Sequence, residues 1–112
     1  MRPIIHTEPT EHPEEHFQNT VLRPILKQQH ALLVSTFRHS FPSLEEQAVA
    51  NRSALLRQKI QKDVVLSATL TGIVLGQMTE EELTIYWNQR AVLAKRLRSM
   101  LIERLVDAYQ RL

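Results

Sequence analysis

The sequence predicts an all-α protein, an antiparallel bundle of three to four helices, and three observations support that class. Apolar residues recur at three- and four-residue spacings over most of the chain. No segment shows the apolar/polar alternation that is typical of a β-strand. Only two glycines occur among 112 residues, of which 43% are hydrophobic. Such a chain can bury one core, so we expect a single helical domain over residues 13–112 after an irregular arm over residues 1–12.

Composition excludes several classes of function. There is no cysteine, so disulfides, thiol nucleophiles and cysteine-bound metal centres are excluded. The N-terminal segment lacks the apolar run of a signal peptide. The longest uncharged run, residues 64–79, is shorter than the ~20 residues that a membrane-spanning helix needs. We therefore expect a cytoplasmic protein that does not cross a membrane, and we interpret the uncharged run as a buried core helix.

Residues 12–16, HPEEH, match the H-x-x-E-H pattern in which two histidines bind zinc and the glutamate acts as a base. The pattern needs both histidines within a helix. Pro13, however, is favoured at the first helical position, and the two glutamates after it suit the positive end of a helix dipole. We therefore interpret His12 as a helix N-cap, out of register with His16, and expect no metal and no other cofactor. Zinc binding and a weak adventitious metal site are the alternatives.

The first helix is expected over residues 14–40, with one apolar stripe made by Phe17, Val21, Ile25, Leu32, Leu33 and Phe37. Pro24 lies inside this helix. A proline within a helix cannot donate a backbone hydrogen bond, and its ring clashes with the carbonyl four residues earlier. We therefore expect the helix to be kinked or broken near Pro24, over residues 21–23. Pro42 then ends the helix, and Ser43 begins the next one.

A second helix is expected over residues 44–76, charged in its first half and apolar in its second. Its expected core residues are Leu55, Ile60, Val64, Leu66, Leu70, Ile73 and Val74. Gly72 and Gly76 lie four residues apart and would leave a groove in which a neighbouring helix could come close. Gly76 could also cap the C-terminus of the helix.

Thr79 and Glu82 have the spacing of a capping box, which predicts the start of a third helix. Its expected core residues are Leu83, Tyr86, Val92, Leu93, Leu97, Met100, Leu101, Leu105, Ala108 and Leu112. The pattern predicts either one long helix to the end of the sequence or two helices with a break near residues 88–90.

Four segments stand out once the helices are placed: FQNTVLRPILKQQ at residues 17–29, IQKD at 60–63, GIVLGQMTEEE at 72–82, and the basic final helix. Together they resemble a small family of uncharacterised bacterial helical proteins, some of whose members carry the label glyoxalase. The resemblance covers about residues 14–111 and implies the all-helical fold. By its label it implies an enzyme, and it assigns no chemical role to any residue.

Asn19, Arg23 and Lys27 recur every four residues and would form a polar stripe on the first helix. A buried arginine needs an acidic partner, and Asp63, beside the uncharged run, is the candidate. We expect either a solvated face or an Arg23–Asp63 pair that sets the register of the helices. The alternative is a pocket for a small anion near the proline kink. In that pocket Arg23 and Lys27 would donate hydrogen bonds, and Asn19 or Gln77 would orient the ligand.

The final helix is basic, with six cations against two acids over residues 83–112, a net charge of +4. Such a charge could bind the phosphates of a nucleic acid. The cations, however, are distributed over several faces of the helix, and no aromatic residues alternate with them. We therefore expect a solvated basic face, with nucleic-acid binding as the weakest of the alternatives. The six cations are Arg90, Lys95, Arg96, Arg98, Arg104 and Arg111.

Ile85, Tyr86 and Trp87 are consecutive, so they place apolar groups on more than one side of the third helix. A helix whose apolar face is wider than one intramolecular contact needs often packs against a partner subunit. No serine or threonine has an obvious base beside it, so we expect no catalytic residue. We therefore expect a non-catalytic binding or interaction protein that forms a homodimer. An enzyme or small-molecule binder is the alternative from a different class.

Overall fold

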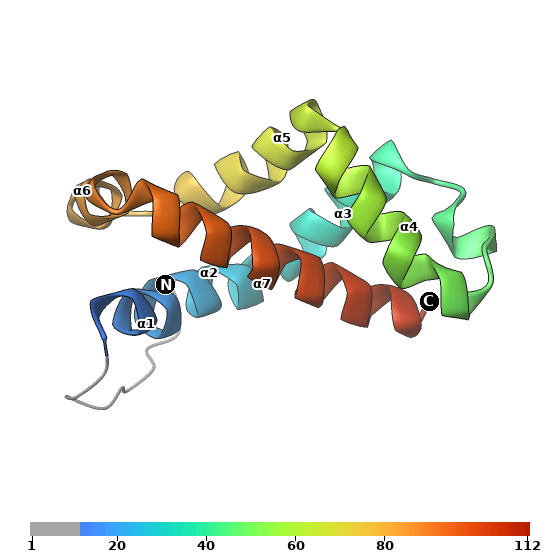
Figure 1. Ribbon diagram of the computed structural model, residues 1–112, viewed down its shortest axis with the longest axis horizontal. Helices are drawn as coiled ribbons and strands as arrows, with labels where there is room; N and C mark the ends of the chain where they lie inside the picture. Colours follow the sequence, from blue (N-terminus) through green and yellow to red (C-terminus); the bar gives the residue numbers. More distant parts are fainter. Residues whose placement is uncertain (1–11) are drawn as a thin grey trace.

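Helices make up almost all of the computed structural model, which describes residues 12–112 (Figure 1). The elements in chain order are α1 (Pro13–Phe17), the π-helical turn η1 (Gln18–Leu22), α2 (Arg23–Gln28), α3 (His30–Ser40), the 3-10 turn η2 (Leu44–Glu46), α4 (Val49–Lys62), α5 (Val64–Leu75), α6 (Glu80–Asn88) and α7 (Arg90–Gln110). No strand occurs within residues 12–112, which confirms the all-α class. The antiparallel bundle of three to four helices is not confirmed, because the long helices predicted from the sequence are divided into shorter ones. The predicted N-terminal arm, apart from His12, lies outside the described residues.

Pro24 lies on a continuous helical path, because the chain widens the turn before it. In η1 the N–H of Arg23 donates to the carbonyl of Gln18, five residues earlier. This wider turn moves the proline ring away from the carbonyl with which it would clash in an α-helix. The hydroxyl of Thr20 donates to the carbonyl of His16 (2.7 Å). The backbone stays helical on both sides of the turn.

The first long helix is interrupted at Gln29, a second position that the sequence did not predict. Gln29 (φ −96°, ψ 12°) separates α2 from α3. Its N–H donates to the carbonyl of Ile25, and its own carbonyl accepts from the N–H of Leu33, so hydrogen bonds bridge the break. Figure 1 shows α3 running in a different direction from α1 and α2. Of the two outcomes predicted near Pro24, a kink or a break, the break does not occur there, and the departure from α-helix takes the form of the π-helical turn directly before the proline.

Asp63 divides the second long helix into α4 and α5, a break that the sequence analysis did not predict. Its backbone is extended (φ −92°, ψ 92°), and its side chain accepts a hydrogen bond from the N–H of Leu66 (2.9 Å), which caps α5. α4 also begins later than expected, at Val49, after the turn η2 that buries Leu44. Gly76 caps α5 as expected, but with φ −64°, outside the left-handed conformation.

The helix start and the optional break predicted for the last third of the chain are confirmed. The hydroxyl of Thr79 accepts from the N–H of Glu82 (3.2 Å), and the Glu82 carboxylate accepts from the N–H of Thr79 (2.9 Å). These two bonds complete the capping box. Gln89 separates α6 from α7, and its N–H donates to the carbonyls of Ile85 and Tyr86. α7 then continues without interruption for 21 residues.

α7 lies at the centre of the core, with a buried residue every four positions: Leu93, Leu97, Leu101, Leu105 and Tyr109. It contacts η1, α3, α4, α5 and α6. Figure 1 shows it crossing most of the length of a molecule that measures 44 × 25 × 24 Å. The other predicted core residues that are buried are Phe17, Val21, Ile25, Leu33, Phe37, Ile60, Leu66, Leu70, Val74 and Tyr86.

Four residues predicted to lie in the core are exposed instead: Leu32, Val64, Val92 and Leu112. Two of them, Leu32 and Val92, immediately precede the buried Leu33 and Leu93. Consecutive helical residues point about 100° apart, so only one of each pair can face the core. Among the helices of the described residues, none is long and apolar enough to span a membrane.

Candidate functional site

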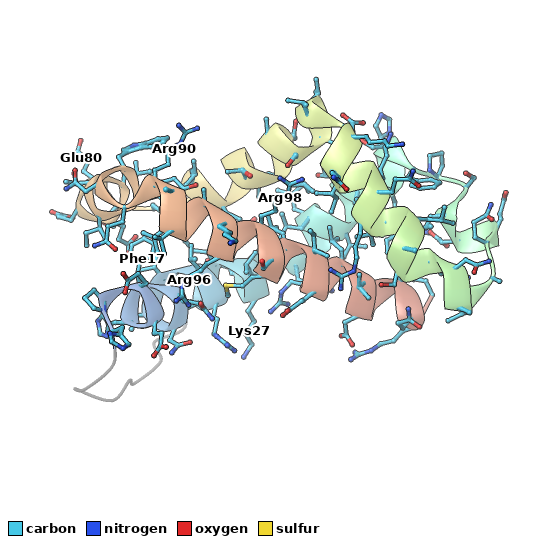
Figure 2. All side chains as sticks on the ribbon, in the orientation of Figure 1. Phe17, Lys27, Glu80, Arg90, Arg96 and Arg98 are labelled. Carbon is cyan, nitrogen blue, oxygen red and sulfur yellow. The ribbon has the colours of Figure 1, made fainter. Side chains whose placement is uncertain are left out.

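The polar stripe predicted at Asn19, Arg23 and Lys27 lies at the surface. Asn19 is half-buried in η1, and Arg23 and Lys27 are exposed on α2. Figure 2 shows Lys27 extending away from the body of the molecule. The stripe is therefore open to solvent, and its two cations do not point into the core.

Asp63 lies apart from this stripe. Figure 1 places the junction of α4 and α5 and helix α2 on opposite sides of α7. The Asp63 carboxylate accepts the Leu66 N–H and pairs with Lys59 (3.0 Å), and so it is not the partner of Arg23. The hydrogen bond from Leu66, followed by the contact with Lys59, lowers the pKa of the Asp63 carboxyl below its ordinary value of 3.8. Gln77 is exposed after the other end of α5, so the five predicted residues do not share one pocket.

His12 occupies the N-cap position that the sequence predicts, and Pro13 is the first helical residue. The backbone of His12 is extended (φ −61°, ψ 148°), and its side chain makes no capping hydrogen bond. With His12 outside the helix, it and His16 do not share a helical face as the H-x-x-E-H pattern requires. Within residues 12–112, no three His, Asp or Glu side chains are grouped as metal ligands would be.

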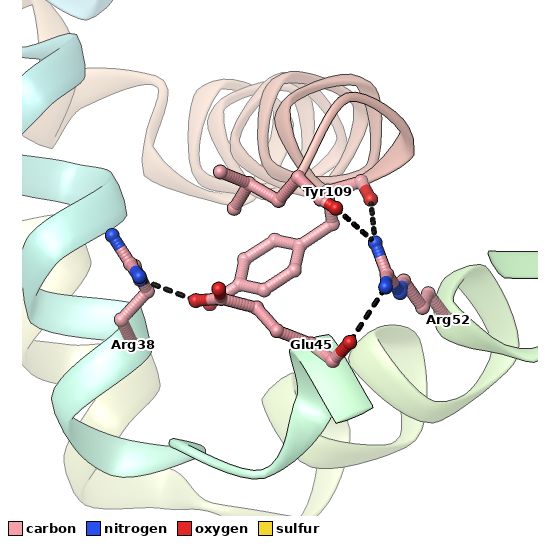
Figure 3. Close-up of polar contacts among 5 residues, drawn as sticks. Arg38, Glu45, Arg52 and Tyr109 are labelled. Carbon is pink, nitrogen blue, oxygen red and sulfur yellow. Dashed lines mark hydrogen bonds and ion pairs between the residues drawn. The ribbon is translucent and has the colours of Figure 1, made fainter. Parts of the chain in front are cut away.

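Arg52 is the one buried charged side chain of the described residues, at 6% exposed. Its guanidinium donates to backbone carbonyls: Nε to Gln47 (3.1 Å), Nη2 to Glu45 (2.6 Å), and Nη1 to Tyr109 (2.7 Å) and Leu112 (3.0 Å). Figure 3 shows the group held between the segment around Glu45 and the last turn of α7. Carbonyls at a helix C-terminus carry partial negative charge, which stabilises the cation. Arg52 therefore links segments that are far apart in the sequence. Its hydrogen-bond donors are used within the protein, so they are not available to a ligand.

Arg52 was not among the predicted site residues, although the sequence contains a signal for it. Arg52 lies four residues before Leu56 and eight before Ile60, and both of these are buried on α4. It therefore falls on the stripe of the helix that faces the core. A charged residue on such a stripe predicts a buried polar interaction.

Tyr109 is fully buried beside Arg52, and its ring packs edge-on against Phe37 with the centroids 5.5 Å apart. Its hydroxyl has no hydrogen-bond partner among the described residues. Burial, with the charge of Glu45 as a second cause, raises the pKa of Tyr109 to about 12. A phenol with that pKa stays neutral under ordinary conditions and is a poor general base.

A groove between α3 and α5 is lined by the residue types of a hydrolytic triad. Ser35, His39 and Asp63 all border this groove, which has a volume of about 570 Å³. A triad requires a hydrogen bond from nucleophile to base and from base to acid. The Asp63 oxygens are instead engaged by Leu66 and Lys59. The groove therefore lacks the connectivity of a catalytic site.

α5 presents a broad uncharged face to solvent. Leu66, Leu70 and Val74 are buried on one side of the helix. The opposite side, which we call the α5 face, consists of Val64, Val65, Ala68, Thr69, Gly72 and Gly76, all exposed. Val64 and Val65 are 76% and 77% exposed, more than any other large apolar residue of the described chain.

Gly72 lies in the middle of the α5 face with open space around it. A Cβ placed on Gly72 would have nothing within 4 Å. No helix of the described chain therefore packs against Gly72. A glycine within a helix costs about 1 kcal/mol relative to alanine, and no contact in the described chain requires one here.

Charged residues flank the α5 face at both ends. Lys59 and Lys62 lie in the last turn of α4, and Lys59 pairs with Asp63, which leaves Lys62 as the free cation at this end. Glu80 and Glu81 lie exposed in the first turn of α6 at the other end. No charged residue occurs between Asp63 and Glu80. The face is thus uncharged in the middle, basic at one end and acidic at the other.

α6 carries a second group of exposed apolar side chains. Tyr86 is buried, whereas Ile85 and Trp87 are 45% and 54% exposed. The Trp87 ring packs edge-on against Tyr86, and the guanidinium of Arg90 lies 5.8 Å from its centroid. The prediction that this helix has apolar groups on more than one side is therefore confirmed.

Comparisons with known proteins add no relative. No family model matches the chain, and no curated protein or solved structure is significantly similar to it. A function for this chain therefore has to follow from its own geometry.

Proposed function

We propose that this chain is a non-catalytic interaction module of the cytoplasm that self-associates through the α5 face. The exposure of an uncharged helix is the observation that carries the proposal: Val64, Val65 and Gly72 face solvent within a run that holds no charge. A helix that is apolar on every side is normally buried on every side. α5 is covered on one side only, and a second copy of the chain supplies the missing cover.

Burial of the valines supplies the driving force for this association. Full burial of an exposed valine side chain is worth about 1.5 kcal/mol. A twofold-symmetric contact uses the same surface of both copies, so each side chain is buried twice. The side chains of Val64 and Val65 are then removed from water in both copies. Part of this gain offsets the translational and rotational freedom that the copies lose.

The charges at the ends of the α5 face favour an antiparallel pair. If the twofold axis passes beside the middle of α5, the end of the α5 face next to Lys62 in one copy lies beside the end next to Glu80 in the other. Lys62 then meets Glu80 of the second copy, at both ends of the contact. A parallel pair would instead place Lys62 beside Lys62 and Glu80 beside Glu80, which is unfavourable.

The same register places the smallest residues where the two helices cross. Ala68 and Gly72 lie on either side of the middle of α5, and two backbones can approach closely where a side chain is absent. The glycine that destabilises α5 in a single copy thus has a function in the pair. The positions of the small residues are thus compatible with the arrangement that the charges favour.

Reversal of the two charges tests the antiparallel pair. We expect Lys62→Glu alone and Glu80→Lys alone each to weaken self-association about tenfold, because each places like charges together. The double variant Lys62→Glu/Glu80→Lys should recover most of the loss. Sedimentation equilibrium over a range of protein concentrations measures the dissociation constants. Lys27→Glu, an equal change of charge on α2, is the matched control and should leave association unchanged.

A bulky residue at the crossing point separates association from folding. Gly72→Leu should leave the fold intact or more stable, because leucine favours a helix and a Cβ at this position has nothing within 4 Å. It should abolish self-association, because the two backbones can no longer approach. Circular dichroism and sedimentation together give both readings. A wild-type chain that stays monomeric at high concentration, or a Gly72→Leu variant that associates like wild type, would refute the proposal.

The alternative from a different class, an enzyme or a binder of small anions, has less support. It requires Asn19, Arg23, Lys27, Asp63 and Gln77 to converge on one pocket. Asp63 instead lies on the far side of α7 from α2, where it caps α5 and pairs with Lys59. No ligand-sized pocket with converging polar groups of the kind that small-molecule sites use is formed by these five residues.

A further inference from the structure

The structure brings together two basic segments that are far apart in the sequence. Arg96 of α7 donates to the side-chain oxygen of Gln18 in η1 (2.9 Å). Arg104, two turns further along α7, lies 3.3 Å from Nδ1 of His30 at the start of α3. The two contacts hold α7 alongside the η1–α2 segment. We call the surface along this seam the α2–α7 surface, and its basic residues are Arg23, Lys27, His30, Lys95, Arg96 and Arg104.

Figure 2 labels two residues of this surface, Lys27 and Arg96, and two cations that lie outside it. Lys27 and Arg96 lie on one side of α7, whereas Arg90 and Arg98 lie on the other. From sequence spacing alone, the cations of α7 were expected on several faces of the helix. The added α2 cations concentrate positive charge on the side of α7 that borders α2.

None of the five permanent cations of this surface is bonded to a carboxylate within the described residues. Arg96 bonds to the neutral amide of Gln18, and Arg104 contacts a histidine. Elsewhere in the chain arginines have acidic partners, as in the pair of Arg111 with Asp107 (2.9 Å). The positive charge of the α2–α7 surface is therefore available to an anionic partner.

His30 borders this surface through its contact with Arg104. A guanidinium has only N–H groups and cannot accept a hydrogen bond. In the contact between Arg104 and His30, Nδ1 of the histidine must therefore accept.

A shallow groove runs along the α7 side of the seam, with a volume of about 580 Å³. Gln18, Lys95, Arg96 and Ser99 line it and supply hydrogen-bond donors, and Glu103 is its one acidic residue. No aromatic side chain lines it, so it offers no platform on which unpaired bases could stack. The distance from Lys95 to Arg104, nine residues of helix, is about 13 Å and can span several backbone phosphates.

We propose that the α2–α7 surface binds the phosphate backbone of a duplex nucleic acid without reading its sequence. The donors are cations spread along two adjacent helices, as backbone contacts require, and no aromatic side chain lines the groove beside them. Phosphate contacts of this kind give weak, salt-dependent affinity. This surface and the α5 face lie on opposite sides of α7. Duplex binding and self-association can therefore be tested separately.

Binding of a mixed-sequence DNA duplex, followed by fluorescence anisotropy at several salt concentrations, tests this proposal. The variant Arg23→Gln/Lys27→Gln/Lys95→Gln removes three exposed cations of the surface. We expect it to lose about tenfold or more in affinity at low salt. The slope of log affinity against log salt concentration should fall by about 3, or about 1 for each cation.

The matched control is Arg57→Gln/Arg90→Gln/Arg98→Gln, which removes the same charge from exposed positions outside the surface. This control should keep the wild-type salt slope, and circular dichroism should show both triple variants folded. Equal losses in the two variants would attribute binding to net charge and overturn the proposal. No binding by the wild-type chain at low salt, or tighter binding to a single strand or to phosphatidylserine vesicles than to the duplex, would also overturn it.

Discussion

Arg52 is a buried cation whose described partners are all main-chain oxygens. Burial of a guanidinium is costly unless its donors are satisfied. The four carbonyls that accept from Arg52 lie in two segments, residues 45–47 and 109–112. The planar guanidinium has donors in several fixed directions and can bond to both segments at once, whereas the single ammonium of lysine cannot.

We expect Arg52→Ala to lower the free energy of unfolding by about 3 kcal/mol, because it leaves buried carbonyls without donors. Arg52→Lys should recover only part of this loss, because one ammonium cannot reach all four acceptors. Urea unfolding measures both values. Arg57→Ala, an exposed substitution on the same helix, should change stability by less than about 0.5 kcal/mol. A loss for Arg52→Ala as small as that would show that the carbonyls find water instead.

The unpartnered hydroxyl of Tyr109 leads to a prediction about alkaline pH. The pKa of Tyr109 is raised from 10.0 to about 12 in the folded state. The folded state therefore holds its proton more tightly, and stability that is complete below pH 10 is lost as the pH rises toward 12. Tyr109→Phe should remove this loss. At neutral pH the variant should be as stable as wild type or slightly more so, because the hydroxyl makes no hydrogen bond.

Urea unfolding at neutral pH and above pH 10 tests the Tyr109 prediction directly. Tyr86, the other tyrosine of the chain, also has a raised pKa because it is buried. Tyr86→Phe is therefore the appropriate comparison and isolates the contribution of each ring. A clear loss of stability for Tyr109→Phe at neutral pH would mean that the hydroxyl is bonded, for instance to a buried water.

At the scale of elements, Asp63 is the residue that turns one long helix into two. Its pKa is lowered mainly by the hydrogen bond from Leu66 and then by Lys59. A carboxyl with a lowered pKa in the folded state stabilises the fold fully above its ordinary pKa of 3.8, and this stabilisation is lost as the pH falls through the folded value. Asp63→Asn keeps a capping group but removes the charge.

We expect Asp63→Asn to be less stable than wild type at neutral pH. The difference should shrink as the pH is lowered below 3.8, because the wild-type carboxyl then takes up a proton and becomes uncharged, like the asparagine amide. Urea midpoints of both proteins across this range measure the effect. A difference that stays constant into strong acid would assign it to the shape of the cap instead of the charge.

The elements that the sequence predicted correctly have local causes. The capping box of Thr79 and Glu82 involves residues three positions apart, and its two hydrogen bonds are formed within that segment. The break at Asp63 also had a local signal, an N-cap residue before an apolar run. It was missed because the apolar period continues across it, so one long helix matched the pattern equally well. Pro24 shows a different limit, since the sequence reveals the missing donor but not that a π-helical turn accommodates it.

The candidate site was harder to predict because it depends on which helices become neighbours. The spacing of Asn19, Arg23 and Lys27 correctly predicted a polar stripe. The partner assigned to it, Asp63, was chosen by charge alone, and packing places that residue on the other side of α7. The proximity of Arg96 to Gln18, 78 positions apart in the chain, likewise follows only from tertiary packing.

At the scale of the whole molecule, α7 separates the two proposed binding surfaces. The α5 face lies on one side of this helix and the α2–α7 surface on the other. Because α7 buries a residue every four positions along its length, it connects the two sides rigidly. An antiparallel pair formed through α5 would thus leave both of its basic surfaces open. Duplex binding by such a pair would gain from two linked contacts.

The contacts of Arg52 also bear on when the chain can fold during its synthesis. Arg52 bonds to Tyr109 and Leu112, which lie 57 and 60 positions later in the sequence. While the ribosome is still translating residues 53–108, half of the acceptors for this guanidinium do not yet exist. Until these acceptors exist, the guanidinium stays hydrated. The side of α4 that carries Arg52 is therefore not buried in the core. We therefore expect the domain to complete its fold only after α7 has left the ribosome, and its folding to be slower than that of bundles with local contacts.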